Sequence, residues 1–334
     1  MSSVSIGDLS NSFMMQRRSV SLRNDLFRLT DELSSGRVAD VKQVLAGNHS
    51  YLTGLERSIE VLEGYSVATT EAAYTTAAMQ VALEKSQELG GDLGIDLLLV
   101  GGGPIGVVSG NPSENAAVQL DGMIKSINTQ VAGRTLFGGI ATDRLPLPDA
   151  QELIDAVRPI VAGLATPADM LAAAETWFAD PAGFDTLIYA GSNTAVAPFI
   201  LSETERLTLD VKANDDAIKN LLMHTTLAAL GNDPALALDV PAQSDLFLMT
   251  GEGLQANQDE ITALRSRIGF TEERIEMISA RNEAEETSLE FARNNLLAVD
   301  PFETATELEN VQFYLQSLYS VTARNAQLSL VNFL

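Results

Sequence analysis

The sequence predicts a mainly α-helical protein, in which long antiparallel terminal helices form a coiled-coil or helical-bundle rod that carries an inserted α+β domain. Three observations support this prediction. Apolar residues recur at heptad-like spacing towards both ends of the chain. Ten of the eleven prolines lie between Pro104 and Pro241, so the middle of the chain differs from its ends. Aromatic residues make up only 6% of the 334 residues, and abundant Ala and Leu favour helices packed side by side.

The chain is strongly acidic, with 45 acidic and 21 basic residues and a formal net charge of −24. This balance argues against binding to nucleic acid or to an anionic membrane surface. The absence of cysteine excludes disulfides and thiol chemistry but leaves the compartment open. No apolar run reaches the 18 residues of a membrane span, and the polar segment 1–8 does not resemble a cleaved signal peptide. We expect any export to use a route without a cleaved leader.

Residues 10–34 carry the first helical pattern, within an N-terminal assembly helix that we assign to residues 1–40. Gly36 follows Ser34-Ser35 and suits the left-handed position after a helix C-terminus. The apolar seam of this helix comprises Met15, Leu22, Leu26, Leu29 and Leu33.

A second long helix is predicted over residues 41–90, in the N-terminal half of a rod domain that covers residues 41–140. Fifty helical residues extend about 75 Å at roughly 1.5 Å per residue, which is too long for a compact domain. Small residues in the middle of the seam permit close approach of another helix. The seam comprises Leu52, Leu55, Ile59, Leu62, Thr69, Ala73, Thr76 and Leu83.

Residues 91–110 contain a Gly-rich motif. The strand-like run Ile95–Val100 precedes Gly101, Gly103 and Gly106, which satisfy the dinucleotide-binding pattern G-x-G-x-x-G. That pattern needs a helix N-terminus directly after the glycines, whereas two more helix breakers follow within seven residues. We therefore expect a flexible connection here.

A new helix is predicted to start at Asn111 as N-cap, with Pro112 and Glu114 at its first and third positions. It extends to about Val131, and a short strand follows within 133–139. Residues 141–251 then form an inserted α+β domain whose ends lie close together. Its expected helices are 149–160, 167–178, 214–230 and 243–249, and its expected strands are Asp185–Tyr189 and Arg206–Val211.

The last third is helical again. Residues 252–299 form the C-terminal half of the rod domain, with a helix over 254–297, and residues 300–334 form a C-terminal assembly helix. Between Asn310 and Leu334 the only charged residue is Arg324. A helix that is apolar on several sides and nearly uncharged must be covered by another surface. Its main stripe is Leu308, Val311, Leu315 and Leu318, and apolar residues off that stripe include Phe313, Tyr314, Tyr319, Val321, Leu330 and Leu334.

No residue pattern indicates an enzyme, a metal site or a cofactor. His49 and His224 lie in different predicted regions, and each is expected to be an ordinary helix residue. Adjacent carboxylates such as Asp215-Asp216 point in different directions on a helix, so they do not form an acid–base pair. The sequence contains no Walker loop, no G-x-S-x-G and no EF-hand.

Four segments in the correct order resemble the flagellin superfamily. Leu29–Arg37 resembles its N-terminal L-x-x-L-S-S-G-x segment, and Ile127–Gly139 is similar to its exit into a variable insertion. Arg267-Ile268-Gly269 and Ala323–Leu334 look like its R-I-G and A-R-x-S-x-L-S-L-L-D-Y-L segments. Within the superfamily, the ending and the modest insertion are most similar to hook-associated protein 3, the hook–filament junction family. Val38–Gln43 departs from the pattern, because the superfamily usually has an Asp/Asn-rich loop there.

This resemblance implies a structural protein of the bacterial flagellum that lies outside the cell and is exported by the type III route. The implied partners are hook-associated protein 1, flagellin, further copies of the chain and a flagellar export chaperone, without nucleic acid or membrane. The alternatives are a flagellin of the filament, a dinucleotide-binding enzyme that uses Gly101, Gly103 and Gly106, and a cytosolic coiled-coil protein. The expected assembly residues are Leu22, Leu26, Leu29, Leu33, Leu308, Val311, Leu315, Leu318, Leu328, Leu330 and Leu334.

Overall fold

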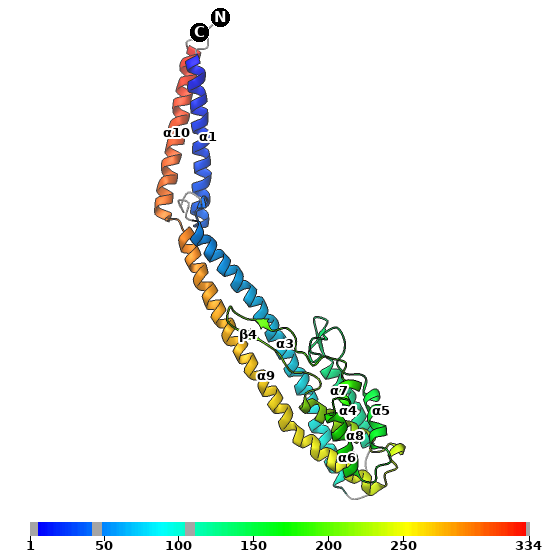
Figure 1. The fold of residues 1–334 in the computed structure, drawn as a ribbon. Coiled ribbons are helices and arrows are strands. Elements are labelled where there is room, and N and C mark those ends of the chain that lie inside the picture. Colours follow the sequence, from blue (N-terminus) through cyan, green and yellow to red (C-terminus); the bar gives the residue numbers. More distant parts are fainter. Residues whose placement is uncertain (1–5, 42–48, 104–110, 332–334) are drawn as a thin grey trace. The chain divides into compact units, whose positions relative to one another are not determined.

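The computed structural model describes residues 6–41, 49–103 and 111–331 and confirms a mainly α-helical protein (Figure 1). Its helices are α1 (Ile6–Ser35), α3 (Ser50–Gly101), α4 (Pro112–Ile127), α5 (Ala150–Val161), α6 (Pro167–Ala179), α7 (Phe184–Leu187), α8 (Asp216–Leu230), the 3-10 turn η1 (Pro234–Leu236), α9 (Val240–Leu297) and α10 (Pro301–Val331). Two short antiparallel ladders pair β1 (Gln130–Val131) with β2 (Arg134–Thr135) and β3 (Phe199–Ile200) with β4 (Arg206–Leu207).

The chain divides into two compact units. The terminal unit comprises residues 1–63 and 284–334, and the central unit comprises residues 64–283. Both boundaries fall inside long helices, α3 and α9. The finer division at residues 40, 140, 251 and 299 remains our proposal.

In the terminal unit, α1 and α10 pack against each other and run in opposite directions. Arg37, just after α1, forms an antiparallel β-bridge with Ala298, just before α10. Further along the pair, Arg23 of α1 reaches Tyr319 of α10. The two contacts show that α1 and α10 are antiparallel, as the sequence predicted.

The end of α1 is fixed by Gly36 and Glu32. Gly36 has a φ of 69°, and its N–H donates to the Glu32 carbonyl oxygen at 2.8 Å, which confirms the predicted left-handed C-terminus. The Glu32 side chain is only 5% exposed, and it accepts hydrogen bonds from Arg28 Nη1 at 2.9 Å and from the Ala39 N–H at 3.1 Å. A buried carboxylate needs such partners, so Glu32 joins α1 to the chain that follows it.

The central unit is built on one large hydrophobic core, to which α3, α4, α8 and α9 contribute and which α5 and α6 extend. The one-turn helix α7 packs Phe184 against Phe178 and Trp177, whose ring centroids lie 5.1 and 6.5 Å from its own. The largest fully buried side chains of this core are Met79, Leu83, Leu93, Leu97, Leu120, Met123, Ile127, Phe137, Leu147, Leu153 and Phe184.

Glycines allow α3 and α9 to approach closely. A Cβ atom added to Gly251 would lie 3.0 Å from the Gly94 carbonyl oxygen, which is tighter than an ordinary contact. The predicted connection at 91–110 is wrong in its first half. Ile95–Val100 is neither a strand nor a loop but part of α3, and the glycines on either side of it, Gly94 and Gly101, lie against α9. Residues 104–110 lie outside the described residues.

Several other predicted elements differ from the structure. The strand predicted at Arg206–Val211 is shorter, since β4 comprises only Arg206–Leu207. The strand at Asp185–Tyr189 is wrong, because Phe184 enters the aromatic cluster through the helical turn α7. The predicted helices 243–249 and 254–297 are one helix, α9, since the glycines between them lie against neighbouring helices. The first helix of the rod domain is described from Ser50 and continues to Gly101, beyond the predicted end at residue 90.

The start of α4 is confirmed in detail. The Asn111 side chain accepts a hydrogen bond from the Glu114 N–H at 3.3 Å, and Pro112 occupies the first helical position. The helix ends at Ile127 instead of Val131, because Gln130–Val131 forms β1. The following strand is shorter than predicted, and Ala132 and Gly133 connect β1 to β2 in a tight hairpin.

Candidate assembly surfaces

The predicted assembly residues of α1 and α10 mostly lie on the faces along which these two helices pack. Leu29 is 2% exposed and Leu315 is 7% exposed. The half-buried members of the two stripes are Leu22, Leu26, Leu308, Val311 and Leu318. One copy of the chain therefore covers much of both stripes by pairing α1 with α10. Whether they also contact a neighbouring copy remains a prediction.

The remaining predicted assembly residues are not part of this buried contact. Leu33 is 39% exposed near the end of α1. Leu328 and Leu330 lie in α10, but their side chains are outside the described residues, as is all of Leu334. The structure consequently brings two predicted leucine stripes together and leaves Leu33 accessible.

A polar contact reinforces the α1–α10 pair. Arg23 Nε and Nη2 donate hydrogen bonds to the Tyr319 hydroxyl oxygen at 3.0 and 2.8 Å, and the guanidinium carbon lies 5.9 Å from the tyrosine ring centroid. The hydrogen bond from Arg23, followed by one from Ser19, lowers the pKa of the Tyr319 phenol. Because this pair is exposed to solvent, it contributes little to the stability of the two helices.

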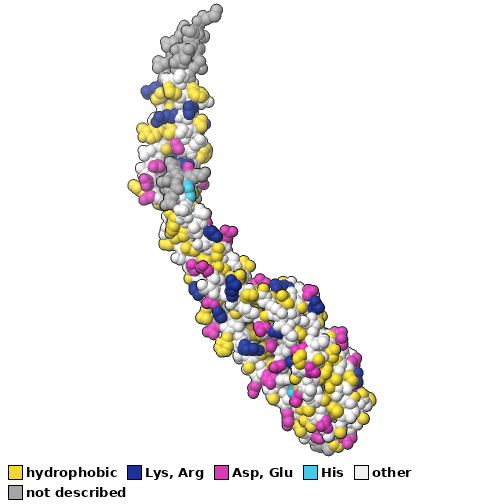
Figure 2. Space-filling model, viewed as in Figure 1, with side chains coloured by type: hydrophobic (Ala, Val, Ile, Leu, Met, Phe, Trp, Pro, Cys, Tyr) yellow, Lys and Arg dark blue, Asp and Glu magenta, His cyan; other side chains and the backbone are white. Residues whose placement is uncertain are grey.

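A second set of apolar residues on the terminal unit points into solvent (Figure 2). On α1, Phe13, Val20 and Phe27 are 62%, 52% and 72% exposed and follow each other at intervals of seven residues. On α10, the exposed apolar residues are Phe302, Phe313, Tyr314, Tyr319 and Val321. No helix among the described residues is both long and apolar enough to cross a membrane. Phe313, Tyr314, Tyr319 and Val321 were predicted from the sequence as apolar residues off the main stripe. Phe302 and the three residues of α1 were not, although the seven-residue spacing of Phe13, Val20 and Phe27 is visible in the sequence.

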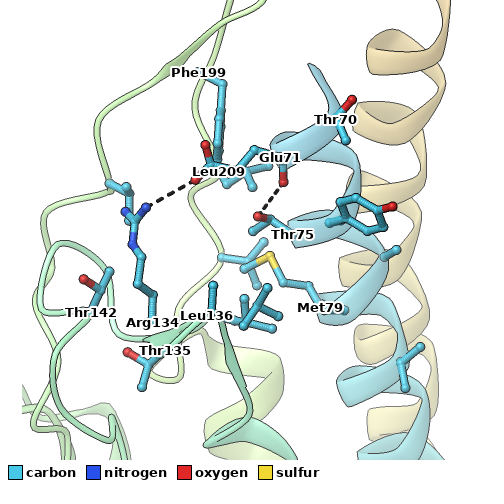
Figure 3. A pocket seen from close by; sticks show the side chains of 18 of the residues that line it. Thr70, Glu71, Thr75, Met79, Arg134, Thr135, Leu136, Thr142, Phe199 and Leu209 are labelled. Carbon is cyan, nitrogen blue, oxygen red and sulfur yellow. Dashed lines mark hydrogen bonds and ion pairs between the residues drawn. The ribbon is translucent and has the colours of Figure 1, made fainter. Parts of the chain in front are cut away.

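The central unit contains an apolar groove of about 770 Å³ beside α3 (Figure 3). We call it the α3 groove. One wall is the α3 segment from Val67 to Val81, and the opposite wall comes from the β1–β2 hairpin and from residues between 196 and 211. Across the groove Arg134 Nη1 lies 3.3 Å from Glu71 Oε1, and both side chains are about half exposed. Among the described residues that line the groove, Arg134 is the only basic one and Glu71 the only acidic one, so its lining is electrically neutral.

The two histidines lie apart from these surfaces. His49 is half-buried just before α3. His224 lies in α8, where burial lowers its pKa to about 4, and its Nδ1 has no hydrogen-bond partner. Among the described residues, no group of three His, Asp or Glu side chains is placed to hold a metal ion.

The dinucleotide-binding alternative lacks its structural context. Gly101 is the last residue of α3, Gly103 follows in a turn, and Gly106 lies outside the described residues. The residues before the glycines are helical, whereas a dinucleotide site needs a strand there and a helix N-terminus after the glycines.

Part of the chain matches a known protein family, and the fold resembles a solved structure. Residues 253–334, which include all of α10, match the family described as the bacterial flagellin C-terminal helical region. No curated protein sequence matches the chain. Among solved structures, the fold is similar to that of a proposed flagellar hook-associated protein from Vibrio parahaemolyticus, with a TM-score of 0.50 and 12% sequence identity. The similarity covers 77% of this chain and 98% of that chain, and at this identity it shows a shared fold.

Proposed function

We propose that the protein is a structural component of the bacterial flagellum, an adaptor at the hook–filament junction that links hook-associated protein 1 to flagellin. One observation carries the proposal: the α1–α10 pair presents exposed aromatic residues, and its C-terminal helix is flagellin-like in sequence. The fold shared with a proposed hook-associated protein supports the same role.

The exposed aromatic residues supply a physical reason for assembly. Phe13, Phe27, Phe302 and Phe313 are each more than 60% exposed in the single chain. Burying one aromatic side chain contributes about 1.5–3 kcal/mol, so a neighbouring subunit that covers several of them binds favourably. A neighbour that covers these residues with a different surface makes heterologous contacts, which build a ring or an open helical layer.

The proposed location and partners follow from this role. The protein leaves the cell through the flagellar type III export route with the help of an export chaperone, and it then joins the outer end of the hook. Its contacts there are hook-associated protein 1, flagellin and further copies of itself. The proposed role is structural and involves no chemical reaction.

A filament flagellin is the second candidate, because the matched family is named after flagellin. The two candidates differ in copy number and in place. A junction protein forms about a single ring at the hook, whereas a filament subunit occurs along the whole filament. Gold-labelled antibodies viewed by electron microscopy separate them, since label along the filament would replace the junction role with the filament role.

A deletion strain tests the adaptor role. Cells without the protein should carry hooks that lack filaments and should release flagellin into the medium. The full chain should restore filaments, whereas a variant that combines Phe27→Glu with Phe313→Glu should not. The control is Val118→Glu in α4, which changes a residue of 64% exposure in the central unit and should restore filaments. Normally attached filaments in the deletion strain would rule out the proposal.

A further inference from the structure

We infer that the outer face of α1 binds the outer face of α10 of a second copy of this chain, in a staggered register that pairs Arg17 with Glu309. The inference rests on the proposed function and deepens it, because it names the contact through which neighbouring copies of the terminal unit meet. The spacing, the exposure and the charge of described residues in that unit support it.

Each helix of the α1–α10 pair carries an exposed heptad stripe on the face that points away from its partner. The α1 outer stripe has spacings of 4, 3, 4 and 3 and comprises Phe13, Arg17, Val20, Asn24 and Phe27. The α10 outer stripe has spacings of 4, 3 and 4 and comprises Phe302, Thr306, Glu309 and Phe313. The buried residues Leu29 and Leu315 follow Phe27 and Phe313 by two positions, which is about 160° around each helix. A second heptad stripe indicates a second helical partner.

The two outer stripes match in period and in length. Helix α1 of one copy and α10 of a neighbour that points the same way are antiparallel, as they are within one chain. The spacing 4, 3, 4 reads the same in both directions, so the stripes fit in one staggered register: Phe13 faces Phe313, Arg17 faces Glu309, Val20 faces Thr306 and Asn24 faces Phe302. Phe302, which is 83% exposed, then enters the gap between Val20 and Phe27.

The α1 outer stripe borders a hollow that suits this partner. The hollow has a volume of about 460 Å³, and Arg17 is the only charged residue among its described lining. No described residue forms an ion pair with Arg17, whereas the one cation of the α3 groove is already paired with Glu71. Glu309 likewise has no ion-pair partner among the described residues. Each outer stripe therefore offers one unpaired charge, of opposite sign, among apolar side chains.

The charges of the terminal pair are separated along its length, and this separation favours a second copy as the partner (Figure 2). Residues 25–35 and 301–309 contain six acidic residues and one basic residue, Arg28, which is paired with Glu32. The basic end of one copy therefore attracts the acidic part of a copy that is shifted along the helix axis. Residues 9–24 and 310–331 form the basic end, with no acidic residue and with Arg17, Arg18, Arg23 and Arg324.

Copies at the same height would bring like charges together. Arg23 contacts Tyr319 within one chain, so Arg17 is level with residue 325 of its own α10. An unshifted neighbour would consequently place Arg324 beside Arg17, which is unfavourable. Meeting Glu309 instead requires a shift of sixteen residues, or about 24 Å at 1.5 Å per residue. The contact is heterologous, so each copy can repeat it with the next.

A two-fold contact between α1 helices is the nearest competing arrangement. If it were centred on Val20, it would pair Phe13 of each copy with Phe27 of the other. It would also gather the three arginines of residues 17–23 from both copies around the two-fold axis. The staggered contact replaces this repulsion with an attraction between opposite charges.

Disulfide trapping tests the register, since the natural chain contains no cysteine. Full-length Val20→Cys and Thr306→Cys are mixed in equal amounts and oxidised, and both substitutions keep every phenylalanine and every charge of the contact. A disulfide requires Cα atoms about 4.4–6.8 Å apart, so this pair is trapped only in the staggered register. The control replaces Thr306→Cys with Ser320→Cys, an exposed position of α10 that approaches Val20 when copies lie at the same height. We expect the first mixed dimer to form about tenfold faster, a difference equivalent to 1.4 kcal/mol.

Charge reversal supplies a second readout. Glu309→Arg should weaken self-association about tenfold in sedimentation velocity, because it places a cation opposite Arg17. Combining Arg17→Glu with Glu309→Arg should restore the association. The matched control is Glu307→Arg, which changes the net charge equally but lies about 160° around α10 from Glu309 and should have a much smaller effect.

Four outcomes would overturn the inference. They are equal or faster trapping of Val20→Cys with Ser320→Cys, dominant trapping of Val20→Cys with itself, no trapping with either partner, and failure of the double charge variant to recover. All four are measured on purified protein. Filament attachment in the deletion strain, which tests the proposed function, is a separate result, so failure of the contact and failure of the adaptor role are distinguishable.

Discussion

Gly101 lies against the backbone of Leu248: a Cβ atom on Gly101 would be 2.6 Å from the Leu248 amide nitrogen. The same atom would lie 2.7 Å from the Ser244 carbonyl oxygen. Both neighbours are backbone atoms of α9, which cannot move aside as a flexible side chain can. The glycine that resembles part of a nucleotide-binding motif is therefore required for the packing of α3 on α9.

This contact makes Gly101→Ala a test of the packing. We expect the substitution to lower the free energy of unfolding of the central unit by about 1–3 kcal/mol, as overpacking of a close contact does. Chemical denaturation followed by circular dichroism measures the change. The control is Gly64→Ala, since a Cβ there meets nothing within 4 Å. Gly64→Ala should raise the free energy of unfolding by about 0.5–1 kcal/mol, the usual difference between Gly and Ala in a helix.

Inward and outward residues of α10 should respond differently to truncation. Leu315 is 7% exposed, so Leu315→Ala should destabilise the α1–α10 pair by about 2–5 kcal/mol. Phe313 is 64% exposed, and Phe313→Ala should change the stability of the single chain by less than about 0.5 kcal/mol. Hydrogen exchange of α1 and α10 measures the first effect. Filament attachment should be lost in both variants, and intact attachment with Phe313→Ala would contradict a role for the outward residues.

His224 should make the central unit sensitive to acid. Burial lowers the pKa of His224 from 6.5 to about 4, with Glu260 opposing part of the shift. The folded protein therefore binds fewer protons than the unfolded chain between these values. The stability contributed by neutral His224 is fully present above pH 6.5 and is lost as the pH falls through the interval down to about 4.

The His224→Leu variant isolates this effect from the many carboxylates of the chain. The free energy of unfolding of the natural chain, relative to the variant, should fall by on the order of 3 kcal/mol between neutral pH and pH 4. Urea denaturation at several pH values measures both proteins. Parallel pH profiles would show that His224 titrates alike in the folded and unfolded states.

The β1–β2 hairpin holds a non-glycine residue in the left-handed region. Ala132 and Gly133 have φ values of 50° and 76°, as a two-residue type I′ turn requires. An alanine is strained there, whereas Asn-Gly is the preferred pair, so Ala132→Asn should raise the free energy of unfolding by about 0.5–1 kcal/mol. Gly133→Ala should lower it by about 1 kcal/mol for the same reason. Thermal melting compares the two variants, and a destabilising Ala132→Asn would contradict the assigned turn.

The sequence predicted the helices well where one face is apolar and capping residues mark the ends. Gly36 at the end of α1 and Asn111 at the start of α4 depend on neighbours close in sequence, and both are confirmed. The predictions that are wrong concern Ile95–Val100 and Asp185–Tyr189. Their conformations depend on α9 and on the aromatic cluster around Phe184, both contributed by distant parts of the chain.

The sequence by itself determined the mainly helical class, the antiparallel terminal pair and the resemblance of its last segment to flagellin, because heptad spacing and local caps are properties of consecutive residues. Only the tertiary structure decided which apolar residues are covered. It showed that Leu29 and Leu315 are buried within one chain, whereas Phe27, Phe313, Tyr74 and Phe270 face solvent. Side chains a few residues apart on a helix can look alike in sequence, and the difference between core and assembly surface depends on which face the partner helix covers.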